Sequence, residues 1–217
     1  MTSIYHITHV SNLSAILREG GLLCDRSAQD RGLCSQSIAY ETIKQRRSVR
    51  PVKKLLGGAV AAGGVLADYV PFYFTNRSPM LLAIHKGQVP SYQAGQEDVV
   101  YLVSSVEAVA NSSRVWCFTD GHAVEGVTQF FDNMGELDKV DWDAVRSWRW
   151  GGKWLREDPD IKRRKQAEFL VHEGFPLSLI TEVGVINQRI QDQVTDLLQS
   201  AGVTIRVTVR PEWYHNV

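Results

Sequence analysis

The sequence predicts an irregular α+β domain. Segments with strand patterns and segments with helix patterns mix along the 217 residues without the regular strand–helix–strand rhythm of a parallel α/β sheet. The chain also lacks a GxGxxG motif, which argues against a dinucleotide-binding Rossmann unit. Its 44% hydrophobic and 22% charged residues are ordinary for a globular protein, and the length fits a single domain over residues 1–217.

The N-terminal segment predicts a strand followed by a short helix. Residues 3–9 alternate loosely between polar and apolar side chains, as a strand does. Ser11 can cap a helix over residues 12–19, and Gly20 with Gly21 ends it.

A second helix is expected over residues 37–47. It should end before the Arg50-Pro51 pair, because the residue that precedes a proline is disfavoured in helical geometry. The Gly/Ala-rich segment 55–67 then predicts a flexible connection, with a substrate lid as the alternative.

Strands dominate the remainder until a long helix near the C-terminus. Short apolar runs predict strands at residues 70–74, 99–104 and 115–119. Ser104 and Glu107 have the spacing of a capping box for a short helix. Residues 187–201 carry apolar side chains on one helical face, stop at Gly202 and lead into an alternating strand over 203–209.

The cysteines and the N-terminus indicate a cytoplasmic protein. The chain has three cysteines, Cys24, Cys34 and Cys117. Their odd number and the lack of a CxxC pair favour free thiols in a reducing compartment. Residues 1–13 resemble neither a signal peptide nor an anchor, and the most apolar stretch, 55–74, is interrupted by glycines, Asp68 and Pro71. We therefore expect no membrane association.

The charges cancel in total but not locally. The chain has 24 basic and 24 acidic residues. Residues 41–54 hold six basic residues against one acid, residues 162–165 are all basic, and residues 120–143 hold seven acids against one lysine. A molecule with a basic side and an acidic side is expected of a protein that docks nucleic acid in one orientation, with the acids pointing away from it.

Four of the six tryptophans fall within residues 142–154, interleaved with arginine and lysine. Such a pattern suits single-stranded nucleic acid, because bases stack on indole rings for about 1–3 kcal/mol each while cations follow the backbone. A packed tryptophan cluster beside a solvated basic face would have the same composition. The pattern alone favours neither interpretation.

Glu168 is the candidate catalytic group that the residues themselves suggest. Hydrolase templates such as GxSxG and HExxH are missing, but Glu168 follows four cations and opens an apolar run that predicts a strand. If Phe169 faces the core, Glu168 faces the basic surface, where a carboxylate can act as a base or stabilise a cation. The alternative is an edge-strand glutamate paired with Arg164.

Several motifs together resemble the DarT family of DNA-modifying toxins. They occur in family order at residues 4–13, 15–22, 70–80, 118–123, 162–171 and 209–214. Members of this family are NAD-dependent ADP-ribosyltransferases that act on bases in single-stranded DNA and are paired with a macrodomain antitoxin. The resemblance implies an ADP-ribosyltransferase-like split mixed β-sheet with flanking helices, NAD as co-substrate and no metal.

The resemblance also implies residues for the cofactor and for catalysis. Those expected to bind NAD are His6, Thr8, Asn12, Gly21, Arg47 and Tyr73. Glu168 matches the catalytic glutamate, which would stabilise a ribosyl cation and accept a proton from the thymine ring. Arg47 matches the catalytic arginine, with Arg46 and Arg50 as close alternatives. For His6 a satisfied core histidine, and for Tyr73 a core aromatic, are the competing interpretations.

The same resemblance implies residues for the acceptor. Those expected to contact DNA or its base are Met80, His122, Trp148, Trp150, Arg163 and Arg164. A core position for Met80 and a turn position for His122 are the alternatives. Two other functions stay open: an RNA-directed transferase of the same broad fold, and a non-catalytic module that binds single strands.

Overall fold

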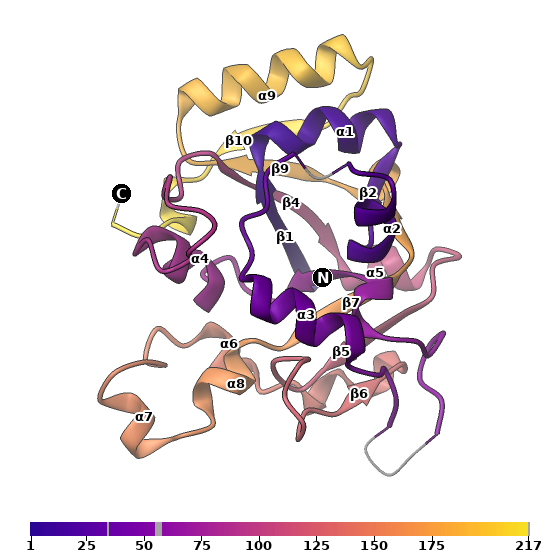
Figure 1. Cartoon of the computed structure of the whole chain (residues 1–217), viewed down its shortest axis with the longest axis vertical. Coiled ribbons are helices and arrows are strands. Elements are labelled where there is room, and N and C mark those ends of the chain that lie inside the picture. Colours follow the sequence, from indigo (N-terminus) through magenta and orange to yellow (C-terminus); the bar gives the residue numbers. More distant parts are fainter. Residues whose placement is uncertain (34, 55–57, 217) are drawn as a thin grey trace.

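An eight-stranded mixed sheet forms the centre of the computed structural model, which describes residues 1–33, 35–54 and 58–216 (Figure 1). The strand order is β10-β9-β4-β1-β3-β7-β5-β6. The strands are β1 (Ser3–His9), β3 (Tyr69–Tyr73), β4 (Val99–Ser105), β5 (Trp116–Thr119), β6 (Phe130–Phe131), β7 (Glu168–His172), β9 (Glu182–Val185) and β10 (Arg206–Val209). Neighbouring strands are antiparallel except β9 and β10. A small second sheet pairs β2 (Gly21–Leu23) with β8 (Gly174–Pro176).

The large sheet is split between β1 and β3. Strand β1 pairs with β4 along its whole length, whereas only Tyr5 and Tyr73 are in register across β1 and β3. Next to this pair the His6 side chain bonds the Pro71 carbonyl, with 2.8 Å between Nδ1 and O. Because Pro71 has no N–H, it cannot donate a ladder bond there. The weak seam leaves room for functional side chains at the middle of the sheet.

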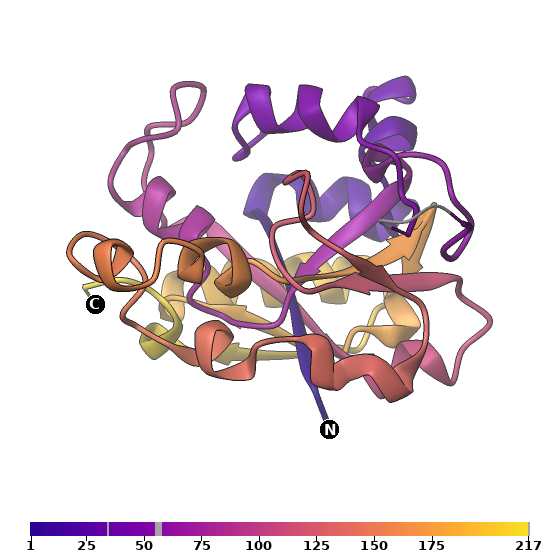
Figure 2. The same cartoon turned by 90° about the horizontal axis from the view of Figure 1, so that it is seen from below.

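Helices surround this sheet. They are α1 (Leu13–Arg18), α2 (Asp25–Asp30), α3 (Glu41–Val49), α4 (Pro79–His85), α5 (Val106–Ala110), α6 (Trp142–Arg146), α7 (Trp154–Glu157), α8 (Ile161–Lys165) and α9 (Gln188–Ser200). The 3-10 segments are η1 (Val10–Asn12), η2 (Leu66–Asp68), η3 (Met134–Lys139), η4 (Leu177–Leu179) and η5 (Pro211–Trp213). In Figure 1, α9 and α1 lie at one end of the molecule and α6, α7 and α8 at the other. Figure 2 shows α3 at the periphery, to one side of the strands.

The elements with the strongest periodicity form where the sequence predicts them. Strand β1 has the expected bounds, and α9 begins after Asn187, whose side chain accepts a hydrogen bond from the Ile190 N–H. The predicted α9 face is buried at Ile190, Val194 and Leu198. Strand β10 starts later than expected, at Arg206.

Local capping differs from the prediction in two places. Helix α3 begins only at Glu41, but it ends as expected, because Arg50 is extended before Pro51. Strand β4 continues through Ser105, so Ser105 and not Ser104 caps α5, and Glu107 accepts hydrogen bonds from the Thr2 N–H. Thus Ser104 and Glu107 do not form the predicted capping box.

The expected flexible connection at 55–67 is only partly within the structure. Residues 55–57 and Cys34 lie outside the described residues. In the remainder of the segment, Val60 and Leu66 are buried in a small apolar cluster with Val52 and Tyr69. Cys24 and Cys117 are buried free thiols. Within the described ranges, every helix is too short or too polar to cross a membrane.

Replacing Gly184 in β9 should weaken the attachment of the C-terminal segment. A Cβ at this position would lie 2.3 Å from the Trp213 ring, which packs edge-on against Tyr5 and Tyr101. We expect Gly184→Ala to lower the free energy of unfolding by about 1–3 kcal/mol through overpacking. Thermal denaturation measures the effect, with Gly126→Ala as control because its Cβ would meet open space. Equal melting temperatures for the two variants would contradict the packing argument.

Candidate active site

Glu168 is held at both carboxylate oxygens. It is the first residue of β7 and is only 3% exposed. The Arg47 guanidinium donates from Nη1 to Oε2 at 2.8 Å, and the Ala123 N–H donates to Oε1 at 3.0 Å. Since β7 lies between β3 and β5, Glu168 is not on an edge strand, and its ion pair is with Arg47 and not Arg164. The edge-strand interpretation is therefore wrong.

Arg47 reaches Glu168 from the last turn of α3 and is 6% exposed. Burial opposes its charge, but the carboxylates of Glu168 and Asp25 outweigh that effect and raise the pKa of the guanidinium. Its Nη2 also approaches the Leu66 carbonyl at 3.4 Å, whereas the buried Nε makes no hydrogen bond within the described structure. Nε lies 3.8 Å from a carboxylate oxygen of Asp25.

The two alternative arginines on either side bind a neighbouring turn instead. Residues 119–128, at the end of β5 and in the loop that leads to β6, are here named the acidic-side turn. Arg46 donates to the Val124 carbonyl at 3.1 Å, and Arg50 donates to the Glu125 carbonyl at 3.0 Å. Of the three candidates, only Arg47 bonds Glu168 among the described residues.

The acidic-side turn is also held from α8 by Arg163. Its Nη1 donates to Asp120 at 3.1 Å and to Thr128 at 3.2 Å, while its carbonyl accepts the His122 N–H at 2.9 Å. Gly121 permits this close approach, because a Cβ would lie 2.3 Å from that Nη1 and would displace the Arg163 side chain. Cations from α3 and α8 therefore fix the turn whose main chain binds Glu168.

Tyr73 and Met80 lie beside the carboxylate. Tyr73 is directly opposite Glu168 in the β3–β7 register, and its hydroxyl lies 3.5 Å from the Met80 sulfur. Burial and the nearby Glu168 charge raise the pKa of Tyr73. This hydroxyl is thus a neutral donor next to an anionic group.

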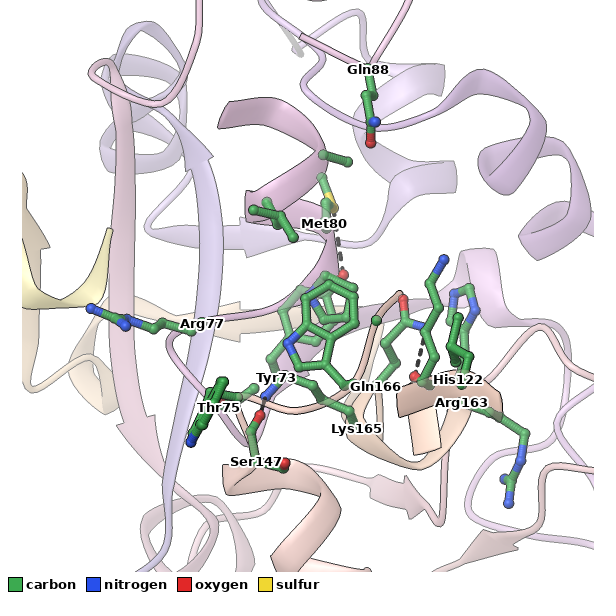
Figure 3. Close-up of a pocket in the computed structure, with 18 of the residues that line it drawn as sticks. Tyr73, Thr75, Arg77, Met80, Gln88, His122, Ser147, Arg163, Lys165 and Gln166 are labelled. Carbon is green, nitrogen blue, oxygen red and sulfur yellow. Dashed lines mark hydrogen bonds between the residues drawn. The ribbon is translucent and has the colours of Figure 1, made fainter. Parts of the chain in front are cut away.

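Two cavities flank α3. One, of about 730 Å³, is lined by His6, Thr8, Asn12 and Gly21, all of them predicted cofactor residues. The other, of about 1270 Å³, is lined by the predicted residues Tyr73, Met80, His122, Trp148, Trp150 and Arg163. Figure 3 shows Tyr73, Met80 and His122 arranged around this larger cavity. Helix α3 contributes side chains to both cavities. The side chains of Arg47 and Glu168 line neither cavity, although Glu168 lies opposite Tyr73 of the larger one.

Within the smaller cavity, the predicted residues mostly shape the wall. The Asn12 amide donates to the Gln36 carbonyl at 2.8 Å and to Thr8 at 3.0 Å, and its oxygen accepts the N–H groups of Ser35 and Gln36. Gly21 leaves no room for a side chain, since a Cβ would lie 2.2 Å from the Phe175 carbonyl.

The structure fits both interpretations of His6, the satisfied histidine and the cofactor residue. It is bonded to Pro71 as a satisfied histidine would be, and it also lines the smaller cavity. Burial lowers the pKa of His6, so the ring is neutral, and its Nδ1–H donates to the carbonyl. Nε2 remains as an acceptor.

The four consecutive cations 162–165 have four different environments. Lys162 is exposed and lines the larger cavity, whereas Arg163 and Arg164 form ion pairs, Arg164 with Asp141, Asp158 and Asp160. Lys165 is buried and donates to the carbonyls of Val145 and Ser147, and burial lowers its pKa to about 8. The expectation that the acids of 120–143 lie apart from the cations is wrong for Asp120 and Asp141.

The tryptophan-rich segment is exposed at its centre. Trp148 is 73% exposed, and the Arg149 guanidinium lies 4.9 Å from its ring centroid and 4.8 Å from that of Trp154. Trp150 lies 6.0 Å from Lys165. The packed-cluster interpretation is wrong for Trp148, and aromatic faces interleaved with cations line the larger cavity.

Sequence reasoning missed three contributors to this site. Asp25 near Arg47, the main-chain N–H of Ala123 and the hydroxyl of Thr119 all act on the Arg47–Glu168 pair, Thr119 by accepting the Glu168 N–H at 2.9 Å. A main-chain donor carries no sequence signal. For Thr119 and Ala123, the family motif at residues 118–123 was the one signal in the sequence.

Comparisons with known proteins find relatives along almost the whole chain. The family model described as "ssDNA thymidine ADP-ribosyltransferase, DarT" matches residues 5–215. The structure of Thermus sp. 2.9 DarT in complex with ADP-ribosylated ssDNA is 41% identical, with a TM-score of 0.88 over 99% of this chain and 96% of that one. The same Thermus protein in complex with NAD+ gives 39% identity and a TM-score of 0.84, over 99% and 98% of the two chains.

A more distant structure shares the fold. Thermosipho africanus DarTG in complex with ADP-ribose is 18% identical, with a TM-score of 0.73 over 99% of this chain and 51% of that one. The split mixed sheet with flanking helices that the sequence predicts is thus confirmed. The family match and these relatives identify a DNA ADP-ribosyltransferase. The chain belongs to the DarT family.

Arg163 and Lys162 should affect different kinetic constants. Arg163 holds the turn that binds Glu168, so Arg163→Gln should lower kcat by about tenfold or more through misplacement of the carboxylate. Lys162 makes no ion pair within the described residues, so Lys162→Gln should raise KM for DNA and reduce the log–log salt slope by about 0.7. Steady-state kinetics at several salt concentrations separates the two. An Arg163→Gln variant that changes only KM and the salt slope would make Arg163 a DNA contact.

Proposed function

We propose that this chain transfers ADP-ribose from NAD to thymidine in single-stranded DNA, as the toxin of a toxin–antitoxin pair in the cytoplasm. Residues 1–217 act as one domain in this proposal. The observation that carries it is the buried Arg47–Glu168 pair, because Arg47 belongs to the helix that lines both cavities and Glu168 lies opposite Tyr73 of the larger one. A transferase needs such a group where the donor and the acceptor meet.

NAD occupies the smaller cavity in this proposal. His6 and Thr8 offer polar atoms to the dinucleotide, while Asn12 and Gly21 shape the wall that it contacts. Tyr73, which lines the larger cavity opposite Glu168, stacks on the nicotinamide end of NAD where the dinucleotide meets the acceptor base. The Thermus relative with NAD+ bound supports this use of the fold.

Glu168 and Arg47 carry the proposed chemistry. The bond between ribose C1 and the nicotinamide nitrogen breaks, and its electron pair leaves with neutral nicotinamide. Glu168 stabilises the resulting oxocarbenium ion and accepts the proton of the thymine ring nitrogen, which forms the new bond to C1. Arg47 stabilises negative charge on the base or the diphosphate. Ala123 and Arg47 keep the carboxylate in one orientation for these roles.

The larger cavity takes the acceptor strand. Met80, His122, Trp148 and Trp150 offer apolar and aromatic contacts to bases, and basic side chains surround them. Arg163 and Arg164 stay predicted DNA residues, although their guanidinium groups are bonded to carboxylates. The Thermus complex with ADP-ribosylated ssDNA supports a DNA acceptor in this fold.

A macrodomain antitoxin is the proposed partner, on the family resemblance. Expression of the chain in a bacterial host should arrest growth, and co-expression of a macrodomain that hydrolyses ADP-ribose from DNA should restore it. Growth at the normal rate while thymidine is being modified would contradict the toxin assignment.

Glu168→Gln should lower the rate of transfer at least about a hundredfold, because the amide keeps the shape but removes the charge and the basicity. Mass spectrometry of a thymidine-containing single strand incubated with NAD measures the rate as a gain of one ADP-ribose. The matched control is Glu173→Gln, at a 76% exposed side chain just after β7. NAD binding by calorimetry checks that the variant folds, since Arg47 loses its anionic partner. A near-normal rate in a folded Glu168→Gln variant would overturn the catalytic assignment.

Duplex DNA should be a poor acceptor. The thymine ring nitrogen is occupied in base pairing, and releasing the base from the stack costs a few kcal/mol. Matched single-stranded, duplex and thymine-free DNA, with an RNA strand of the same sequence, can be compared by product mass. Equal rates on single strand and duplex contradict the prediction. Modification of RNA alone would support the RNA-directed alternative, and binding without NAD consumption would support the non-catalytic one.

A further inference from the structure

The larger cavity has a strong excess of positive charge. Seven lysine or arginine residues line it, against a single carboxylate, that of Glu125. Figure 3 shows that these cations do not gather at one point: Arg77 lies on one side of the cavity, and Arg163 lies on the other beside His122. The cavity therefore has two basic ends, with Tyr73 and Lys165 between them.

The charges at the His122 end are neutralised within the protein. Arg46 lies 3.2 Å from a Glu125 oxygen, and Arg163 lies 3.1 Å from Asp120 and 2.7 Å from Asp160. These arginines support the acidic-side turn, as described above. Their positive charges are therefore largely neutralised by carboxylates of the protein itself.

The charges at the opposite end have no such partners. Arg77 and Lys86 lie there, on either side of α4, and together with the central Lys165 they are here named the α4 cation cluster. All three line the cavity beside the His215 ring, and none forms an ion pair with a carboxylate in the described parts of the chain. Among the described residues, the Arg77 guanidinium donates to the Glu212 carbonyl alone, from Nε at 3.0 Å and from Nη2 at 2.8 Å. Lys86 is exposed at the end of α4.

The cations act on the neighbouring His215 ring. Burial, followed by the positive charges of Arg77, His85, Lys165 and Lys86, lowers the pKa of His215 to about 4, so the ring is neutral. His215 is held in place by Gln96 through its main chain, at 2.6 Å and 3.1 Å, and its buried Nε2 has no hydrogen-bond partner among the described residues. Arg77, Lys86 and Lys165 thus line one cavity beside a neutral ring and without a carboxylate partner, and an anion there would be stabilised by their charge.

We infer that the α4 cation cluster binds a backbone phosphate of the acceptor strand, adjacent to the nucleotide that receives ADP-ribose. This inference rests on the proposed function. At about 1270 Å³, the cavity exceeds the roughly 300–1,000 Å³ that suit one small ligand, so it has room for a neighbouring nucleotide. With the base beside Tyr73 and Met80, a neighbouring phosphate that contacts Arg77 and Lys86 stays within the same cavity.

The diphosphate of NAD is the other source of the same chemistry. The predicted cofactor residues His6, Thr8, Asn12 and Gly21 line the smaller cavity on the other side of α3, so the dinucleotide is centred there. The test must nevertheless separate the two phosphates. Lys86 is the side chain to change, because Arg77 and Lys165 bind main-chain carbonyls and hold the local structure.

The experiment scans single methylphosphonate linkages, which lack the phosphate charge, along a short thymidine-containing single strand. With the full-length wild-type chain, one linkage next to the target should lower kcat/KM by about three- to fivefold, as expected for one exposed ion pair. Lys86→Gln should lower kcat/KM on the natural strand to the same degree. Replacing that one linkage by methylphosphonate should then cause no further fall in the kcat/KM of the variant. The control Lys139→Gln, at an exposed lysine outside both cavities, should retain the wild-type pattern.

Three outcomes would overturn the inference. One is a Lys86→Gln variant that remains as sensitive as wild type at every linkage. Another is an increase in KM for NAD with no change for DNA, which would assign the site to the dinucleotide. The third is a wild-type enzyme that tolerates every methylphosphonate while still modifying the strand. If the wild type modified no DNA at all, the proposed function would fail instead, so the two failures are distinguishable.

Discussion

The buried ion pair of Arg47 and Glu168 is the interaction on which the rest of the structure depends. Taking two charges out of water costs several kcal/mol per ion, and well-packed apolar residues would often be as stable. Stability alone thus does not explain the pair. The Glu168 carboxylate needs the Ala123 N–H, and the Arg47 guanidinium needs α3 in place. Strand β7 must also lie inside the sheet, so that Glu168 faces the seam beside Tyr73.

The even balance of charge in the sequence reflects how this pair is supported. Arg46, Arg50 and Arg163 bind the acidic-side turn from two helices, and Asp120 with Glu125 supplies part of the opposite charge. Some of the basic residues that the sequence suggests for nucleic-acid binding therefore hold the Glu168 carboxylate in place instead. The positive charge that remains for a ligand lies at the Arg77 end of the larger cavity, where the described wall has no carboxylate.

Periodicity and family motifs predicted the outline of the molecule but not its ion pairs. Strand β1 and helix α9 follow from alternation and from an apolar helical face, which are local properties. The motif residues His6, Thr8, Asn12 and Gly21 do line one cavity together. The fates of Arg163 and Arg164 could not be predicted, because their partners include Asp120 and Asp141, far away in the chain, and side-chain pairing at that range depends on the packed fold. The predicted partner of Ser104 was also lost to a distant contact, since Glu107 accepts from Thr2 at the N-terminus.

Helix α3 is shared by both cavities, and this has a thermodynamic consequence. Thr42 and Arg46 face the larger cavity, whereas Glu41 and Lys44, on the same few turns, face the smaller one. A ligand that displaces this helix from one side changes the shape available on the other. Linkage then requires reciprocity: whatever factor one substrate applies to the affinity of the second, the second applies to the first. Any coupling between ligands of the two cavities that acts through α3 thus depends on the position of a single nine-residue helix.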